Sequence, residues 1–126
     1  MRSGSPLREF LHANDLGEAC VFSLENWSSL AENAPCDDHG APLTFLNVGT
    51  GIDITIKDLS QKIAEVVGFD GKILWDTSKP DGTPQKRLDV SRLRRMGWRS
   101  SISLTDGLAM AYQDFQNELA FKRLRE

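Results

Sequence analysis

The sequence contains few of the residues that usually signal a metal site, a disulfide framework or a membrane segment. It has 2 cysteines and 2 histidines in 126 residues. Cys20 and Cys36 form no Cys-x-x-Cys pair, and His12 and His39 add too few ligands for a structural zinc site. No apolar run approaches the roughly 20 residues that span a membrane, and the first residues lack the apolar core of a signal peptide. We therefore expect a cytoplasmic protein with no metal site and no membrane contact.

Complete catalytic sets are also missing. Tyr112 is the only tyrosine, and Gln116 stands four residues later, so the Tyr-x-x-x-Lys pair of short-chain dehydrogenases is absent. No Ser/His/Asp set has a recognisable spacing. Cys20 lies on the apolar face of a predicted helix, which favours a buried structural cysteine over a nucleophile. We expect no catalytic residue in this chain.

Composition and charge limit the class of protein further. The length and the 40% of hydrophobic residues fit one domain over residues 1–126. The net charge is −3, so bulk nucleic-acid binding is not indicated. One basic cluster falls on a short predicted helix, where a solvated face is favoured over a nucleic-acid patch: Arg92, Arg94, Arg95 and Arg99.

Hydrophobic periodicity predicts alternating strands and helices. Strands are expected at 7–12, 43–48 and 72–75, and helices at about 15–27, 55–67, 91–96 and from 103 onward, with a surface loop at 28–42. The order strand, helix, strand, helix, strand, short helix, helix indicates an α/β (mixed α+β) fold with at least some parallel pairing.

Capping residues mark the helix ends. Helix starts are expected at Asn14 or Asp15, at Thr55 with Asp58, and at Ser103 with Asp106. Gly68 and Gly97 are expected to end two helices. The cations of residues 122–125 suit the negative end of the last helix dipole.

Gly49-Thr50-Gly51 has two interpretations. A glycine pair between a strand and a helix is the setting of a dinucleotide-binding turn, but Ile54 stands where that motif needs its third glycine. A tight structural turn is therefore favoured over a cofactor site.

Arg8 and the segment 76–98 contain candidate binding residues. Arg8 is either half of a surface ion pair with Glu9 or a guanidinium that an extended segment presents to an anion. In DTSKPDGTPQKRLDVSRLRRMGW, two prolines stiffen the turn around Asp81, which could accept hydrogen bonds from sugar hydroxyls. The cations that could meet a diphosphate are Lys79, Lys86 and Arg87.

Three stretches together resemble the C-terminal part of the GDP-L-fucose synthases, which are extended short-chain dehydrogenase/reductases. They are GSPLREFLHANDLGEACVF (4–22), NVGTGIDITIKDLSQKIAEVVGFDGKILWDTSKPDGTPQKRLDVSRLRRMGW (47–98) and ISLTDGL (102–108). The resemblance covers nearly the whole chain except the loop 28–42 and the tail. It implies the substrate-binding part of a Rossmann-type fold without the N-terminal dinucleotide-binding half.

The resemblance implies a function and a set of site residues. The family epimerises GDP-4-keto-6-deoxy-D-mannose at C3 and C5 and reduces C4 with NADPH, which gives GDP-L-fucose. In that family, the positions matching Arg8, Asp81 and Lys86 belong to the GDP-sugar site, with Arg8 contacting the nucleotide-sugar. Two cations would offset a diphosphate, and a carboxylate would accept from hydroxyl groups. Gln85 stands in place of a usual basic residue, which lowers the charge of the site.

The same resemblance implies that this chain alone is catalytically incomplete. The family's NADP-binding turn and its catalytic residues lie upstream of the matching region, so no cofactor is expected to bind here. The helix at 15–27 and the NVGT segment would pack on that other half, supplied by a separate chain or replaced by self-association. The alternative is a non-enzymatic fold remnant or interaction module that binds no nucleotide-sugar.

Overall fold

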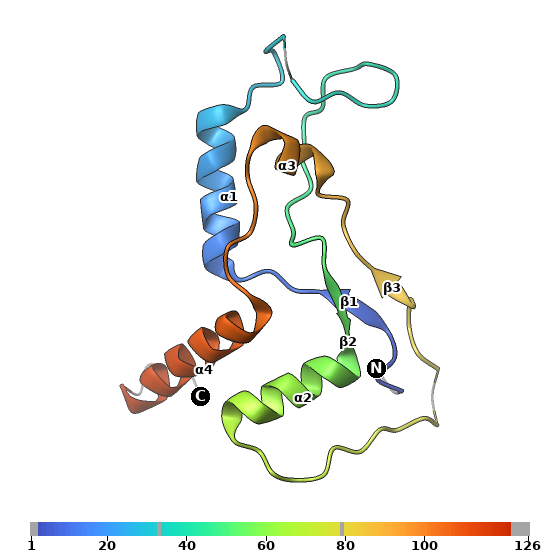
Figure 1. Cartoon of the computed structure of the whole chain (residues 1–126), viewed down its shortest axis with the longest axis vertical. Coiled ribbons are helices and arrows are strands. Elements are labelled where there is room, and N and C mark those ends of the chain that lie inside the picture. The colour runs from blue at the N-terminus through green and yellow to red at the C-terminus, as the bar shows by residue number, and fades with distance from the viewer. Residues whose placement is uncertain (1–2, 33, 79, 122–126) are drawn as a thin grey trace. The chain divides into compact units, whose positions relative to one another are not determined.

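The computed structural model describes residues 3–32, 34–78 and 80–121 (Figure 1). Lys79 and the basic tail 122–125 lie outside the described residues. The elements follow one another as β1 (Leu7–Glu9), α1 (Ala13–Asn26), β2 (Asp53–Thr55), α2 (Ile56–Val67), β3 (Gln85–Lys86), α3 (Ser91–Met96) and α4 (Leu104–Ala120). The predicted order of strands and helices is confirmed, and so is the mixed α/β class.

The chain divides into two compact units. The α2–α4 unit comprises Met1–Arg8, Ile54–Gln85 and Ile102–Glu126, and the α1–α3 unit comprises Glu9–Asp53 and Lys86–Ser101. The strands form one sheet in the order β2-β1-β3, and the division falls within each strand. A single domain over the whole chain stays a prediction.

The α1–α3 unit contains the only core cluster of buried residues among those described. Ala19 from α1 packs with Leu93 from α3 and with Trp98, and all three are at most 7% exposed. Partly buried hydrophobic residues surround them: Leu11, Phe22, Leu46, Val48 and Met96. Asp15 is fully buried beside this core and accepts hydrogen bonds from the backbone N–H (3.1 Å) and hydroxyl (3.0 Å) of Ser101. These bonds offset the cost of burying a carboxylate.

The α2–α4 unit is held by contacts between its two long helices and by the segment before β1. Gly4 in that segment is buried, with φ +77°. A Cβ at Gly4 would lie 3.0 Å from both the Trp75 ring and Cβ of Lys57. The backbone N–H of Lys57 also donates to the Gly4 carbonyl at 2.9 Å. The start of α2 is thus tied to the segment that leads into β1.

Two of the predicted strands are wrong. Residues 43–48 and 72–75 form no strand, and the second and third strands lie instead at Asp53–Thr55 and Gln85–Lys86. An apolar run becomes a strand only where a neighbouring strand completes its ladder of hydrogen bonds. No described strand lies beside 43–48, although Leu46 and Val48 still reach the core.

The helices agree better with the sequence, because their hydrogen bonds are local. Thr55 caps α2 and Ser103 caps α4, each accepting from the backbone N–H three residues later, at Asp58 (3.0 Å) and Asp106 (3.1 Å). Gly68 and Gly97 end α2 and α3 with positive φ, as predicted.

The first helix differs from its prediction in two respects. Its N-cap is His12, whose Nδ1 accepts from the backbone N–H of Asn14 at 3.2 Å, whereas Asn14 and Asp15 lie inside the helix. Cys20 is exposed and not buried. The reason is that only a narrow side of α1, with Asp15 and Ala19, meets the core.

We expect Gly4→Ala to lower the free energy of unfolding by about 1–3 kcal/mol, because an L-residue at this positive φ is strained and its Cβ meets Trp75. The measurement is the urea midpoint. Gly17→Ala is the matched control, since nothing lies within 4 Å of its Cβ and Gly17 is inside α1. That change should stabilise the chain by about 0.5–1 kcal/mol. Equal midpoints for the two variants would contradict this view of Gly4.

Candidate substrate-binding site

Arg8 and Asp81, two of the predicted site residues, belong to the α2–α4 unit. Arg8 lies in β1 and is partly buried, with its Nη1 donating to the carbonyl of Leu7 at 2.6 Å. Asp81 is exposed, and its carboxylate accepts from the backbone N–H of Ser3 at 3.1 Å and from the Ser3 hydroxyl. These contacts fix both side chains to the segment around β1.

Backbone hydrogen bonds hold the neighbouring residues of the same segment. The N–H of Leu7 donates to the carbonyl of Pro84 at 2.8 Å, and the N–H of Ile56 donates to the carbonyl of Pro6 at 3.1 Å. Residues 3–7 therefore lie beside 81–84, with Ser3 hydrogen-bonded to the Asp81 carboxylate and Leu7 hydrogen-bonded to the Pro84 carbonyl. These hydrogen bonds position both the segment that leads to Arg8 and the turn that carries Asp81.

The loop that leads to Asp81 begins with an ordered turn. Oδ1 of Asp76 accepts from the hydroxyl of Ser78 at 2.6 Å and from its backbone N–H at 2.9 Å. These two hydrogen bonds lower the pKa of Asp76. Such a turn and the two prolines that follow limit the conformations of the loop, as the sequence predicts for a stiff segment.

Lys86, the third predicted site residue, belongs to the α1–α3 unit. It lies in β3 and is exposed. It borders a cavity of about 470 Å³ whose other described lining residues are Glu9, Leu11, Val48, Gly49, Arg87 and Leu88. Two cations, Lys86 and Arg87, thus face one cavity of this unit.

Glu9 fixes the walls of this cavity. Its Oε1 accepts from the backbone N–H of Gly51 at 2.6 Å and from the hydroxyl of Thr50 at 3.2 Å. Its Oε2 accepts from the backbone N–H of Leu88 at 2.9 Å. We call these three hydrogen bonds the Glu9 network. The network joins β1, the Gly-Thr-Gly turn and the segment that immediately follows Lys86.

Both glycines of the turn are explained by packing inside the unit. A Cβ at Gly49 would collide with the Glu9 carboxylate and lie 3.3 Å from Val90. Gly51 has φ +72°, and a Cβ there would lie 2.8 Å from Nη2 of Arg94, which donates to the Thr50 carbonyl. The structural interpretation of the turn therefore accounts for both residues.

The alternative of an Arg8–Glu9 surface ion pair is wrong. Neighbouring side chains of a strand point to opposite faces. Arg8 donates to a backbone carbonyl, whereas Glu9 accepts from three donors of other segments. One feature of the sequence pointed to this network: a turn with two glycines leaves space for a side chain from another segment.

Part of the predicted basic cluster lines a second cavity of the α1–α3 unit. Its volume is about 510 Å³, and its described lining residues are Gly51, Arg87, Leu88, Asp89, Val90, Ser91, Arg94 and Arg95. The backbone N–H of Ser91 donates to Asp89 at 2.9 Å and lowers the pKa of that carboxyl, with a smaller effect of the hydroxyl of Ser91 and of the Arg92 and Arg95 cations.

Solved structures establish the class of fold. A GDP-6-OMe-4-keto-L-xylo-heptose reductase from C. jejuni superposes with a TM-score of 0.80 at 31% identity, over 93% of this chain and 33% of that one. A GDP-mannoheptose C4 reductase from Campylobacter jejuni, solved with NADP bound, gives a TM-score of 0.71 at 29% identity over 91% of this chain and 33% of that one. The chain has part of the fold of extended short-chain dehydrogenase/reductases that act on GDP-sugars.

Curated relatives that match the chain include GDP-L-fucose synthases. The GDP-L-fucose synthase of Escherichia coli K12 is 47% identical over 121 residues, covering 95% of this chain and 36% of its own length. The putative GDP-L-fucose synthase 2 of Arabidopsis thaliana is 46% identical over 121 residues, covering 96% and 33%. The chain matches the C-terminal third of GDP-L-fucose synthases, and the predicted resemblance is confirmed. No family model matches the chain.

We expect Glu9→Gln to weaken the Glu9 network, because the amide turns an N–H₂ group toward backbone donors and leaves one of them without an acceptor. The expected loss of unfolding free energy is about 1–3 kcal/mol. Amide hydrogen exchange at Gly51 and Leu88 should become at least about tenfold faster. Glu18→Gln, an exposed position on α1, is the control. Unchanged exchange at both amides would show that Glu9 does not hold them.

Proposed function

We propose that this chain supplies the GDP-sugar-binding part of a GDP-L-fucose synthase. The observation that carries the proposal is the pairing of 3–7 with 81–84, which fixes Arg8 and Asp81 on adjoining backbone segments of one unit. The match to the C-terminal third of GDP-L-fucose synthases supports the same assignment.

Each proposed residue has a chemical role in binding. Arg8 is partly buried and retains donors beyond the one that binds the Leu7 carbonyl, so it suits an oxygen of the diphosphate. Lys86 is exposed and adds a second cation. Asp81 has two carboxylate oxygens and can accept from sugar or ribose hydroxyls beside its bonds to Ser3.

The reaction of the whole enzyme is part of the proposal. NADPH would reduce C4 of GDP-4-keto-6-deoxy-D-mannose after epimerisation at C3 and C5, with the cofactor and the catalytic acid and base held outside this chain. The chain spans about a third of the relatives that it matches. Arg8, Asp81 and Lys86 would hold and orient the substrate, and no group in this chain is assigned a proton or hydride transfer.

The binding test is titration of the chain with GDP-mannose by isothermal calorimetry. We expect a dissociation constant in about the millimolar range or tighter. Arg8→Ala should weaken binding about tenfold or more, because it removes a charge-assisted hydrogen bond to the diphosphate. Asp81→Asn and Lys86→Ala should weaken it by smaller factors, since both side chains are exposed.

Lys72→Ala is the matched control, because Lys72 is an exposed cation of the α2–α4 unit outside the proposed site. Circular dichroism of each variant separates a lost contact from a lost fold. A folded chain that binds no GDP-mannose at millimolar ligand would favour the non-enzymatic alternative. Equal losses of GDP-mannose affinity for Lys72→Ala and Arg8→Ala would show that the binding is non-specific charge attraction.

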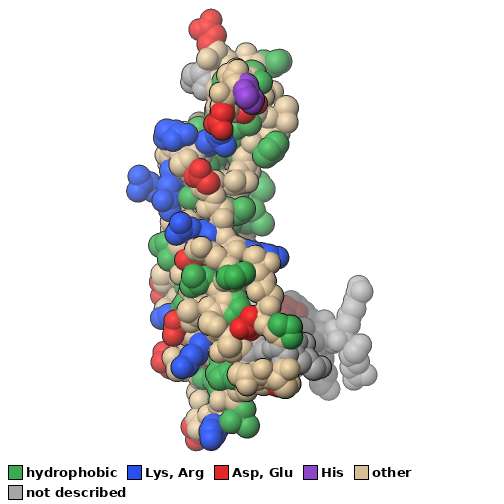
Figure 2. All heavy atoms as spheres, turned by 90° about the vertical axis from the view of Figure 1, so that its right-hand side faces the viewer, with side chains coloured by type: hydrophobic (Ala, Val, Ile, Leu, Met, Phe, Trp, Pro, Cys, Tyr) green, Lys and Arg blue, Asp and Glu red, His purple; other side chains and the backbone are tan. Residues whose placement is uncertain are grey.

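We also propose a surface of this chain that contacts the dinucleotide-binding portion of the enzyme. Hydrophobic side chains are scattered over the face of the molecule shown in Figure 2. On α1, Leu16 and Leu24 are eight residues apart, on one side of the helix, and are 47% and 86% exposed. We assign this side of α1 to contact with the dinucleotide-binding portion of the enzyme, since exposed apolar helix faces mark such interfaces.

Without that portion, the same side of α1 should drive self-association. We expect the chain to form dimers or larger species at high concentration, and Leu24→Glu to shift it toward the monomer, because a charge opposes burial of the face. Sedimentation velocity measures the shift. Leu30→Glu is the control, at a leucine outside α1 that is 95% exposed. An effect of Leu30→Glu equal to that of Leu24→Glu would contradict the assignment to α1.

No described helix is long and apolar enough to cross a membrane. The cytoplasmic location stays a prediction.

A further inference from the structure

A third cavity of the α1–α3 unit is lined by none of the residues Arg8, Asp81 and Lys86. It has a volume of about 530 Å³, in the range of small-molecule sites. The end of α1, the loop after it and α3 form its walls. Its described lining residues are Asn26, Trp27, Ser28, Ala31, Ala34, Pro35, Cys36, Arg92, Arg95 and Met96.

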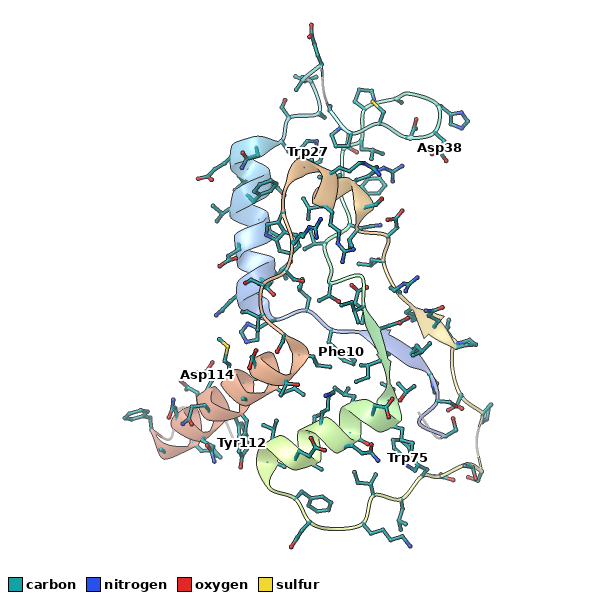
Figure 3. All side chains as sticks on the ribbon, viewed as in Figure 1. Phe10, Trp27, Asp38, Trp75, Tyr112 and Asp114 are labelled. Carbon is teal, nitrogen blue, oxygen red and sulfur yellow. The ribbon has the colours of Figure 1, made fainter. Side chains whose placement is uncertain are left out.

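Trp27 is one of the residues that line this cavity. Its indole Nε1 is buried and has no hydrogen-bond partner in the part of the chain that the structure describes. Because this atom is closed to solvent, the Trp27 ring, and not its N–H, is the part that a ligand in the cavity would contact. Figure 3 shows Trp27 beside α3, the helix that contributes the cavity's two arginines.

The charged lining residues have one sign. Arg92 and Arg95 are three residues apart on α3 and therefore share a side of the helix. Neither guanidinium has a hydrogen bond or ion pair with another described residue. No Asp or Glu is among the described lining residues. Asp89, the carboxyl that both arginines affect, borders the neighbouring cavity with Arg95 instead.

Local hydrogen bonds hold the loop residues 28–32 and 34–42 where they line this cavity. The N–H of Ala31 donates to the Ser28 carbonyl at 3.1 Å, and the N–H of Ala34 donates to the Ala31 carbonyl at 3.0 Å. The N–H of Leu43 then donates to the Pro35 carbonyl at 2.8 Å. The wall opposite α3 is thus built by local turns.

We propose that this cavity binds a small phosphorylated molecule, with Arg92 and Arg95 on its phosphate and the Trp27 ring against the rest of the ligand. Two guanidinium groups match the charge of a phosphate dianion and the arrangement of its oxygens. The cavity is larger than a phosphate ion, so the rest of the ligand lies against the polar and apolar groups of the loop. None of the proposed GDP-sugar residues lines this cavity.

The test follows the indole N–H resonances of the 3 tryptophans in ¹⁵N-labelled chain during titration with inorganic phosphate. The Trp27 resonance is assigned by its loss in Trp27→Phe. We expect a saturable shift of this resonance, with a dissociation constant in about the millimolar range or tighter. Arg92→Gln and Arg95→Gln should each weaken binding about tenfold. Chloride at matched ionic strength and acetate should give no saturable shift.

The controls keep the outcome clear. Arg99→Gln removes an exposed cation that does not line the cavity and should leave the affinity unchanged. The Trp98 resonance reports whether the buried core is intact. If Arg92→Gln or Arg95→Gln shifts it, the Arg→Lys variant at the same position is measured instead. No saturable shift with phosphate, an equal response to acetate, or an equal loss in Arg99→Gln would overturn the proposal. Because GDP-mannose binding is measured separately, either proposal can fail without the other.

Discussion

The Glu9 carboxylate is the contact on which the α1–α3 unit depends. Three donors from two distant segments converge on it: the N–H of Gly51, the hydroxyl of Thr50 and the N–H of Leu88. A partly buried carboxylate that accepts several hydrogen bonds is held firmly, because each bond offsets part of its desolvation. The positions of Lys86 and Arg87 beside the cavity follow from this anchoring of Leu88. Glu9 therefore connects a structural turn to a candidate binding surface.

Few hydrophobic residues are buried in the two units of the chain. Only Ala19, Val90, Leu93 and Trp98 are buried hydrophobic residues among those described, and all lie in the α1–α3 unit. The α2–α4 unit relies on backbone pairing and on Gly4 instead. The chain spans about a third of the length of the relatives that it matches.

Local features of the sequence predicted local structure well. Thr55, Ser103, Gly68 and Gly97 cap or end helices as expected, since a cap needs only residues within one turn. The apolar run at 43–48 predicts a strand. Such a run indicates that a segment is buried, but it does not show that a partner strand exists. Leu46 and Val48 do pack on the core, so the burial was correct and the strand was wrong.

The sequence by itself determined the helices, the α/β order and the resemblance to GDP-L-fucose synthases, because these depend on periodicity, caps and motif residues near one another in the chain. The candidate residues Arg8, Asp81 and Lys86 also came from motif positions. Only the tertiary structure decided that Ser3 holds Asp81, that Glu9 accepts from Gly51 and Leu88, and that Trp27 lies with Arg92 at one cavity. Those contacts join residues 40 or more positions apart, and a hydrogen bond over such a separation exists only once the chain has folded.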